Sequence, residues 1–300
     1  MLYDQQYAFV SRDQAIATQT VRGATAFGIY PFNRYARVEL STGVYQYEQG
    51  YNDEGLQQVA NDYQIEQYGR TLFSSGTFMP FGVAFVQETT VFREYGPLAG
   101  NTVRVGYEYA PSLGKFLSRQ TADVDARHYT RLATNGVLAF RARGFKSWGE
   151  FPGYMYFGGN SELRGYDYLE FLGNKAFFLN GELRFPLIEA ALTPIGVIGG
   201  LRGVAFANIG AAGYEGVKTQ VWTRDPITVT PLLGFQPNYE TLTYDPVYGE
   251  PQTIGGLKLV DGRASYGVGL ETFALGFPIH FDWSWRTLLN KQYEDYVFAY

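Results

Sequence analysis

Apolar and polar residues alternate with a period of two along much of this chain. In FFLNGELRFPL, at Phe177–Leu187, Leu179 and Leu183 fall on one face of an extended strand, and Glu182 and Arg184 fall on the other. A soluble sheet with one wet face would also alternate. Here, however, ions recur at the same phase in nearly every other candidate strand, and unpaired charges in a dry core would be costly. A tube with an apolar outer surface and a charged lumen explains the pattern better.

The alternation predicts about twelve strands, each close to the roughly 9–11 residues that a tilted membrane strand needs. The expected segments are Tyr3–Ser11, Gln19–Tyr30, Asn33–Glu48, Thr77–Phe92, Asn101–Ala110, Ser118–Arg131, Gly136–Phe145, Ala176–Pro186, Gly196–Ile209, Gly262–Ala274, Phe277–Arg286 and Tyr293–Tyr300. We therefore predict an all-β fold for residues 1–300, a transmembrane antiparallel up-and-down β-barrel domain.

The connections between these segments alternate in length. Short ones such as Pro31–Phe32 and Leu275–Gly276 are followed by long ones, among them Lys146–Lys175 and Gly210–Asp261. Barrels of the bacterial outer membrane combine short periplasmic turns on one rim with long external loops on the other. This alternation of short and long connections predicts an outer-membrane location and the lipid bilayer as a partner. Loop 210–261, rich in proline and tyrosine, is either a surface-recognition loop or a lid.

By the alternation along each strand, charged residues of both signs should point into the lumen. They predict a solvated ion network there. Its expected members are Asp123, Asp125, Arg127, Arg141, Arg143 and Arg184. Asp123 and Asp125 could also be a carboxylate pair for acid/base chemistry, and Arg141 with Arg143 could attract an anionic solute. Because both signs are interleaved on neighbouring strands, we favour the ion network.

Composition narrows the class of protein further. Aromatic residues make up 17% of the chain, with 25 Tyr and 23 Phe, which suits aromatic girdles at two membrane interfaces. A net charge of -5 argues against nucleic-acid binding. With no cysteine and two histidines, we expect no thiolate or histidine metal site, no cofactor and no catalytic residue. Ser112 and Lys115 match an S-x-x-K motif, which we interpret as a hairpin tip.

The amino-terminal residues MLYDQQYAFVSRDQ lack the basic and apolar regions of a signal peptide. Because a barrel must be exported, we expect this sequence to be the carboxy-terminal part of a longer chain. The preceding part would hold a signal peptide, some strands and a periplasmic domain.

The segments FGGNSELRGY, at Phe157–Tyr166, and GELRFPL, at Gly181–Leu187, resemble the BamA/TamA surface-antigen superfamily of outer-membrane assembly and translocation barrels. Its barrels have about sixteen strands, and its [LV]-R-G-[FY] tetrad lies at the tip of a loop that folds back into the lumen. The resemblance places Leu163, Arg164, Gly165 and Tyr166 at this tip, on loop 146–175. YPFNRYARVEL, at Tyr30–Leu40, is similar to a TolB-propeller-linked subgroup.

The resemblance also implies partners for the tip arginine on the barrel wall. Glu182 stands where the superfamily has an acid on the strand after the loop, and Asn208 replaces the aspartate of its F-x-D-x-G motif. An arginine deep in a barrel needs an anionic or multi-acceptor partner. We therefore expect Arg164 to be held by Glu182 and Asn208. The final alternating aromatics, Tyr296, Phe298 and Tyr300, resemble the carboxy-terminal insertion signal of barrel proteins.

The resemblance implies a protein that helps to insert or translocate client or periplasmic polypeptides at the outer membrane. Its own insertion would depend on the barrel-assembly machinery. The alternative is a passive pore or surface-binding barrel without assembly activity, and we expect no enzymatic reaction in either case.

Overall fold

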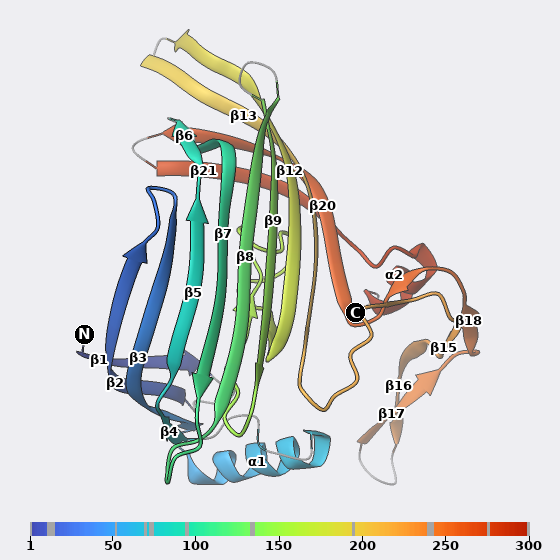
Figure 1. Ribbon diagram of the computed structural model, residues 1–300. Coiled ribbons are helices and arrows are strands. Elements are labelled where there is room, and N and C mark those ends of the chain that lie inside the picture. Colours follow the sequence, from blue (N-terminus) through green and yellow to red (C-terminus); the bar gives the residue numbers. More distant parts are fainter. Residues whose placement is uncertain are drawn as a thin grey trace.

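The structure is a computed structural model that describes residues 2–10, 16–51, 53–68, 71, 75–93, 96–132, 136–193, 196–238, 243–274 and 277–298. One antiparallel sheet dominates it (Figure 1). In spatial order its eleven main strands are β1 Leu2–Val10, β2 Ile16–Pro31, β3 Ala36–Tyr51, β5 Phe81–Glu88, β7 Gly96–Ala110, β8 Arg119–Leu132, β9 Gly136–Trp148, β12 Lys175–Thr193, β13 Gly196–Gly213, β20 Gly262–Ala274 and β21 Phe277–Thr287. Each pairs with its neighbours in the chain, which confirms the predicted all-β, up-and-down architecture.

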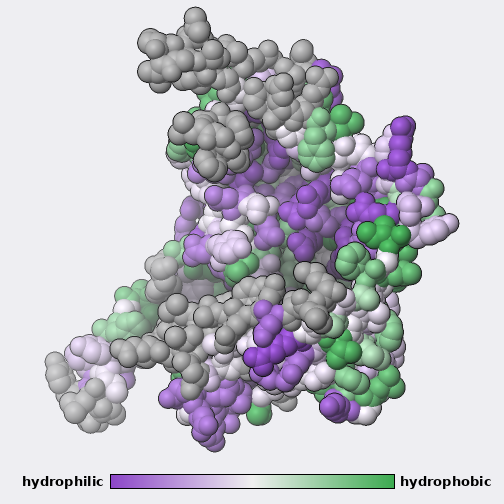
Figure 2. Space-filling model, turned by 90° about the vertical axis from the view of Figure 1, so that its left-hand side faces the viewer, coloured by the Kyte–Doolittle hydropathy of each residue, from purple (hydrophilic) through white to green (hydrophobic). Residues whose placement is uncertain are grey.

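The sheet curves around a hollow whose centre is lined by hydrophilic residues (Figure 2). Its path ends at β1 on one side and at β21 on the other, and no pairing joins these two strands within the described residues. Two short strands lie off this path: β4, Gly76–Phe78, pairs with β3, and β6, Val91–Arg93, pairs with β7.

Large apolar side chains cover the outer face of the sheet. Phe140 on β9 and Leu179 on β12 are 49% and 45% exposed, and Trp283 on β21 is 53% exposed. The inner face carries the ions, so the parity assigned from the sequence holds on these strands. An apolar surface of this extent is stable against acyl chains and not against water.

Three parts of the chain differ from the elements expected from the sequence. The segment Thr77–Phe92 is divided between β4, β5 and β6, with a break at Met79 and Pro80, because proline cannot donate a ladder hydrogen bond. The loop after β3 contains a helix, α1, Glu54–Tyr68, whose first turn Asp53 caps by accepting from the Leu56 N–H at 2.7 Å.

No helix within the described residues is both long and apolar enough to cross a bilayer.

The third correction concerns the last predicted strand, Tyr293–Tyr300. Lys291–Val297 forms helix α2, with Asn290 as its N-cap, so Tyr296 lies on a helix and Phe298 is its C-cap. Tyr300 lies outside the described residues. The expectation that the insertion signal forms a strand is therefore wrong. As a result, four main strands follow the tetrad, where five were expected. Tyr293 and Val297, four residues apart, both pack on the buried cluster of Leu259, Ala264 and Leu288, a helical spacing that stabilises α2.

Candidate functional site: the inner loop and its wall contacts

Residues 149–174, between β9 and β12, fold back on the inner face of the sheet and are called the inner loop below. Within it, β10, Met155–Phe157, pairs with β11, Phe171–Gly173. Phe157 and Leu163 of the loop are fully buried with Phe178 of β12, and the Phe157 and Phe178 ring centroids lie 5.6 Å apart. The loop thus has a small apolar core in common with the wall.

Arg164 is the most heavily partnered residue of the loop tip. It is 7% exposed, and its Nη2 donates to Glu182 Oε1 of β12 at 2.8 Å. Its Nε lies 3.5 Å from Asp282 Oδ2 of β21 and donates to the Asn160 carbonyl at 3.0 Å. The guanidinium also stacks on Phe206 of β13, 4.4 Å from the ring centroid. One buried cation therefore joins the loop to β12, β13 and β21.

The second expected partner of Arg164, Asn208, bonds elsewhere. Its amide donates to Ser265 Oγ at 3.2 Å, and its carbonyl oxygen accepts from Asn180 at 2.8 Å. Asp282 instead supplies the second carboxylate. A neutral amide cannot compensate the positive charge of a buried guanidinium, whereas a carboxylate can. Hydrogen bonds between two charged groups are also roughly twice as strong as neutral ones.

Gly165 brings the loop backbone against β21. Its φ of +88° is left-handed, and a Cβ at this position would lie 2.8 Å from Ser284 Oγ, so only glycine fits without strain. The Gly165 carbonyl accepts from Arg286 Nε at 2.5 Å. The Arg286 guanidinium also lies over the Tyr166 ring, 4.6 Å from its centroid.

Tyr166 adds a contact to β20. Its hydroxyl donates to the Ala264 carbonyl at 3.1 Å, and burial raises the pKa of the phenol to about 12. Because the folded-state pKa lies above the ordinary value of 10, this contribution to loop stability is complete below pH 10 and is lost as the pH rises through about 12.

Replacing Tyr166 with phenylalanine should remove this hydrogen bond and weaken loop docking by about 1 kcal/mol. Hydrogen exchange of the loop amides would measure the change. The wild-type loop should also become more exchangeable, relative to the wall strands, between pH 10 and 12, and Tyr166→Phe should remove that excess. An equal pH response in both proteins would contradict the assignment.

The predicted lumen ions fall into separate groups. Asp125 contacts Arg127 and Arg141, at 3.0 and 2.9 Å, while Asp123 pairs with Arg104 of β7. Arg143 lies 3.9 Å from Glu162 of the inner loop. Arg184 contacts Glu182 at 2.6 Å, so it belongs to the arginine site. Two of these ion pairs join neighbouring strands, two lie within one strand, and the Arg143–Glu162 pair joins the wall to the inner loop.

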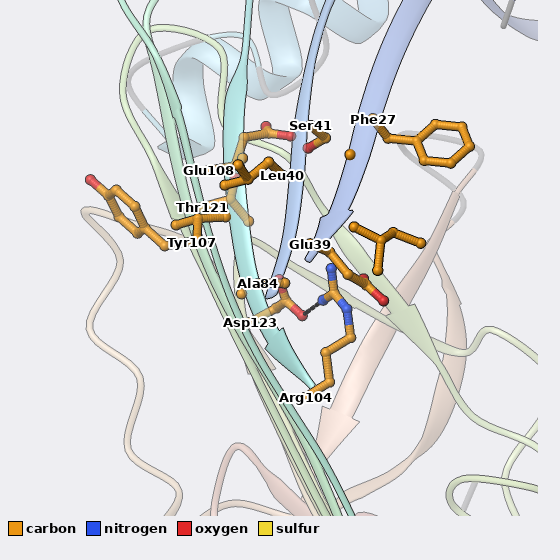
Figure 3. A pocket seen from close by; sticks show the side chains of 15 residues that line it. Phe27, Glu39, Leu40, Ser41, Ala84, Arg104, Tyr107, Glu108, Thr121 and Asp123 are labelled. Carbon is orange, nitrogen blue, oxygen red and sulfur yellow. Dashed lines mark hydrogen bonds and ion pairs between the residues drawn. The ribbon is translucent and has the colours of Figure 1, made fainter. Parts of the chain in front are cut away.

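A groove of about 340 Å³ lies on the inner face near the Arg104–Asp123 pair (Figure 3). In the β2–β3 register Phe27 pairs with Ser41, and Ile29 pairs with Glu39. Phe27 is 69% exposed on this inner face. Figure 3 shows Phe27 and Tyr107 pointing in opposite directions. Part of the inner wall is therefore apolar, which the sequence interpretation did not include.

Parity placed Asp282 and Arg286 inward, but only the structure brings them to the loop tip. Within the described residues, no group of three His, Asp or Glu side chains is close enough to hold a metal ion. Contacts between ions, aromatic rings and backbone carbonyls can fix the position of a loop. This arrangement can therefore hold the inner loop against the wall.

Neither a protein-family model nor a curated protein matches the chain. Among solved structures, it is similar to BamA from Haemophilus ducreyi lacking POTRA domains 1–3, with a TM-score of 0.64 and 14% identity over 95% of this chain and 54% of that chain. It also matches CdiB from Escherichia coli, with a TM-score of 0.45 and 13% identity over 95% of this chain and 45% of that one. The chain thus spans about half the length of either structure. The likeness to BamA shows a shared barrel fold, and the predicted resemblance is confirmed at that level.

Proposed function

We propose that this barrel lies in the outer membrane and takes part in the insertion or translocation of polypeptides there. The observation that carries the proposal is the buried contact of Arg164 with Glu182 and Asp282. A loop that is bonded to β12, β20 and β21 at once holds together the strands at the β21 end of the sheet. The barrel fold that this chain has in common with BamA supports the same role, as does its sequence resemblance to the BamA/TamA superfamily.

The proposed mechanism is mechanical and includes no catalytic step. The inner loop holds β20 and β21 in place, so the outer edge of β21 is presented to a client. An unpaired strand edge offers a row of N–H and C=O groups to which a client strand can add. The partners are the lipid bilayer, client or periplasmic polypeptides and, for the barrel's own insertion, the barrel-assembly machinery.

Reconstitution tests the proposed function. The purified protein, in vesicles, would be mixed with a urea-unfolded outer-membrane barrel, and folding of the client would be followed by its heat-modifiable mobility in a gel. Faster client folding than in protein-free vesicles is the expected result.

The hydrophilic hollow also fits a passive pore (Figure 2). Planar-bilayer recording distinguishes the two. Small, flickering currents are expected from a lumen that holds a docked loop. A steady, ion-selective conductance together with no effect on client folding would favour the pore and contradict the proposal.

A further inference from the structure

Residues 214–238 and 243–261, between β13 and β20, fold into a narrow β-ribbon that we call the arm (Figure 1). Three successive strand pairs build it: β14 Trp222–Thr223 with β19 Lys258–Leu259, β15 Ile227–Val229 with β18 Gln252–Ile254, and β16 Leu232–Asn238 with β17 Thr243–Tyr248. The pair β16–β17 is the distal hairpin. The arm is therefore an ordered element and not an open loop.

The base of the arm lies on the outer face of the barrel wall. Leu259 of β19 is buried with Leu288 and with Ala264 of β20, and Tyr293 of α2 packs on the same cluster. Ala264 has the same parity as Tyr266, which is 52% exposed on the outer face. The arm and α2 accordingly project beside the wall, as seen to the right of β20 in Figure 1.

This base adjoins an aromatic band. Tyr266 of β20 stacks on Trp285 of β21, with ring centroids 5.8 Å apart, and Trp285 is 51% exposed. Trp283 and Phe281 continue the band along β21 at 53% and 57% exposure. Tyrosine and tryptophan concentrate where a membrane meets water. The arm base thus adjoins outward-facing residues of the types that concentrate at that interface.

Several polar contacts hold the arm in place. Lys258, fully buried, donates from Nζ to the carbonyls of Asp225 and Gly256, at 2.8 and 3.1 Å. Tyr296 of α2 donates to the Thr230 carbonyl at 3.1 Å. The direction in which the arm projects is therefore set by the fold.

The distal hairpin has two unlike faces. On one, Phe235, Tyr244 and Tyr248 are 64%, 71% and 60% exposed, and all three belong to one cross-strand face. On the other, Gln236 pairs with Asp245, which accepts a hydrogen bond from Asn238 at 2.8 Å. Exposed aromatic faces of this kind mark contact with a membrane or another protein.

We propose that the arm is a membrane-surface anchor, with the aromatic face of β16–β17 seated in the headgroup region of the bilayer beside β20. The arm base packs on Ala264, two residues from Tyr266 on the same outward face, and this position beside the Tyr266–Trp285 pair supports a lipid partner. Pro237 and Pro246 lie on the two strands of the hairpin and cannot donate ladder hydrogen bonds, which disfavours a polypeptide adding to its edges. The inference rests on the outer-membrane location proposed above.

Single spin labels test this anchor. The chain has no cysteine, so Phe235→Cys and Gln236→Cys give adjacent labels on opposite faces of one hairpin, and Leu179→Cys places a reference label on the outer wall. The full chain would be reconstituted in phosphatidylcholine–phosphatidylglycerol vesicles. The collision rate with a water-soluble nickel complex should be several-fold lower at 235 than at 236, and oxygen collisions should show the opposite order.

Each other outcome has a definite meaning. Equal nickel access at 235 and 236, with lipid contact at 179, would overturn the anchor and leave the membrane location standing. Spin–spin broadening at 235 that disappears on dilution would identify a second copy as the occupant and also overturn it. Water contact at 179 would contradict the outer-membrane location itself.

Discussion

Replacing Arg164 with alanine is expected to release the inner loop from the wall. The substitution leaves Asp282 without its cation and Glu182 with Arg184 alone. Losing one partner of a buried ion pair costs about 3 kcal/mol at the lower end of the usual range, so the loop should open roughly a hundredfold more often. Hydrogen exchange of residues 155–173 would measure this opening.

Arg164→Lys is the matched control, because it keeps the charge and removes the planar fork that reaches two carboxylates. Exchange in this variant should fall between wild type and Arg164→Ala. Client folding in vesicles should decline in the same order if the docked loop supports assembly. Unchanged loop exchange in Arg164→Ala would show that the ion pair does not hold the loop.

Replacing Phe157 with alanine is the second change with a large expected effect. Its ring is fully buried and stacks on Phe171, with centroids 5.1 Å apart, and it also contacts Phe178 of the wall. A large-to-small change at such a position costs roughly 3–5 kcal/mol. The inner loop should become sensitive to proteases while the wall stays folded.

Phe157→Leu is its control, since it keeps most of the apolar volume and should lose less than half as much protection. Tyr168, 80% exposed on the same loop, gives a second control, because Tyr168→Ala removes no buried contact. Equal protease sensitivity in Phe157→Ala and Tyr168→Ala would contradict the small core between loop and wall.

The wall was predictable because it depends on a two-residue period that lipid and water impose on every strand. Leu179 and Glu182 follow this rule, and parity alone placed them on opposite faces. The carboxy terminus was not predictable in the same way. Tyr293, Tyr296 and Val297 fit a helical spacing as well as the alternation of Tyr296, Phe298 and Tyr300, and the Asn290 cap decides for the helix.

The candidate site was predictable only in part. The resemblance brought Arg164 to Glu182, which the structure places at 2.8 Å. Asp282 is far from the loop in sequence, so parity could place it inward but could not bring it to Arg164. The aromatic contact with Phe206 also depends on the distance between strands, which a single sequence does not contain.

A double-mutant cycle between Arg164 and Glu182 measures the contact that the loop restraint requires. Loop opening would be determined by hydrogen exchange for wild type, Arg164→Ala, Glu182→Ala and the double variant. A coupling free energy of about 1–3 kcal/mol is expected for residues in one ion-pair network. Strictly additive effects, with no coupling between the two positions, would contradict a loop pinned through Arg164.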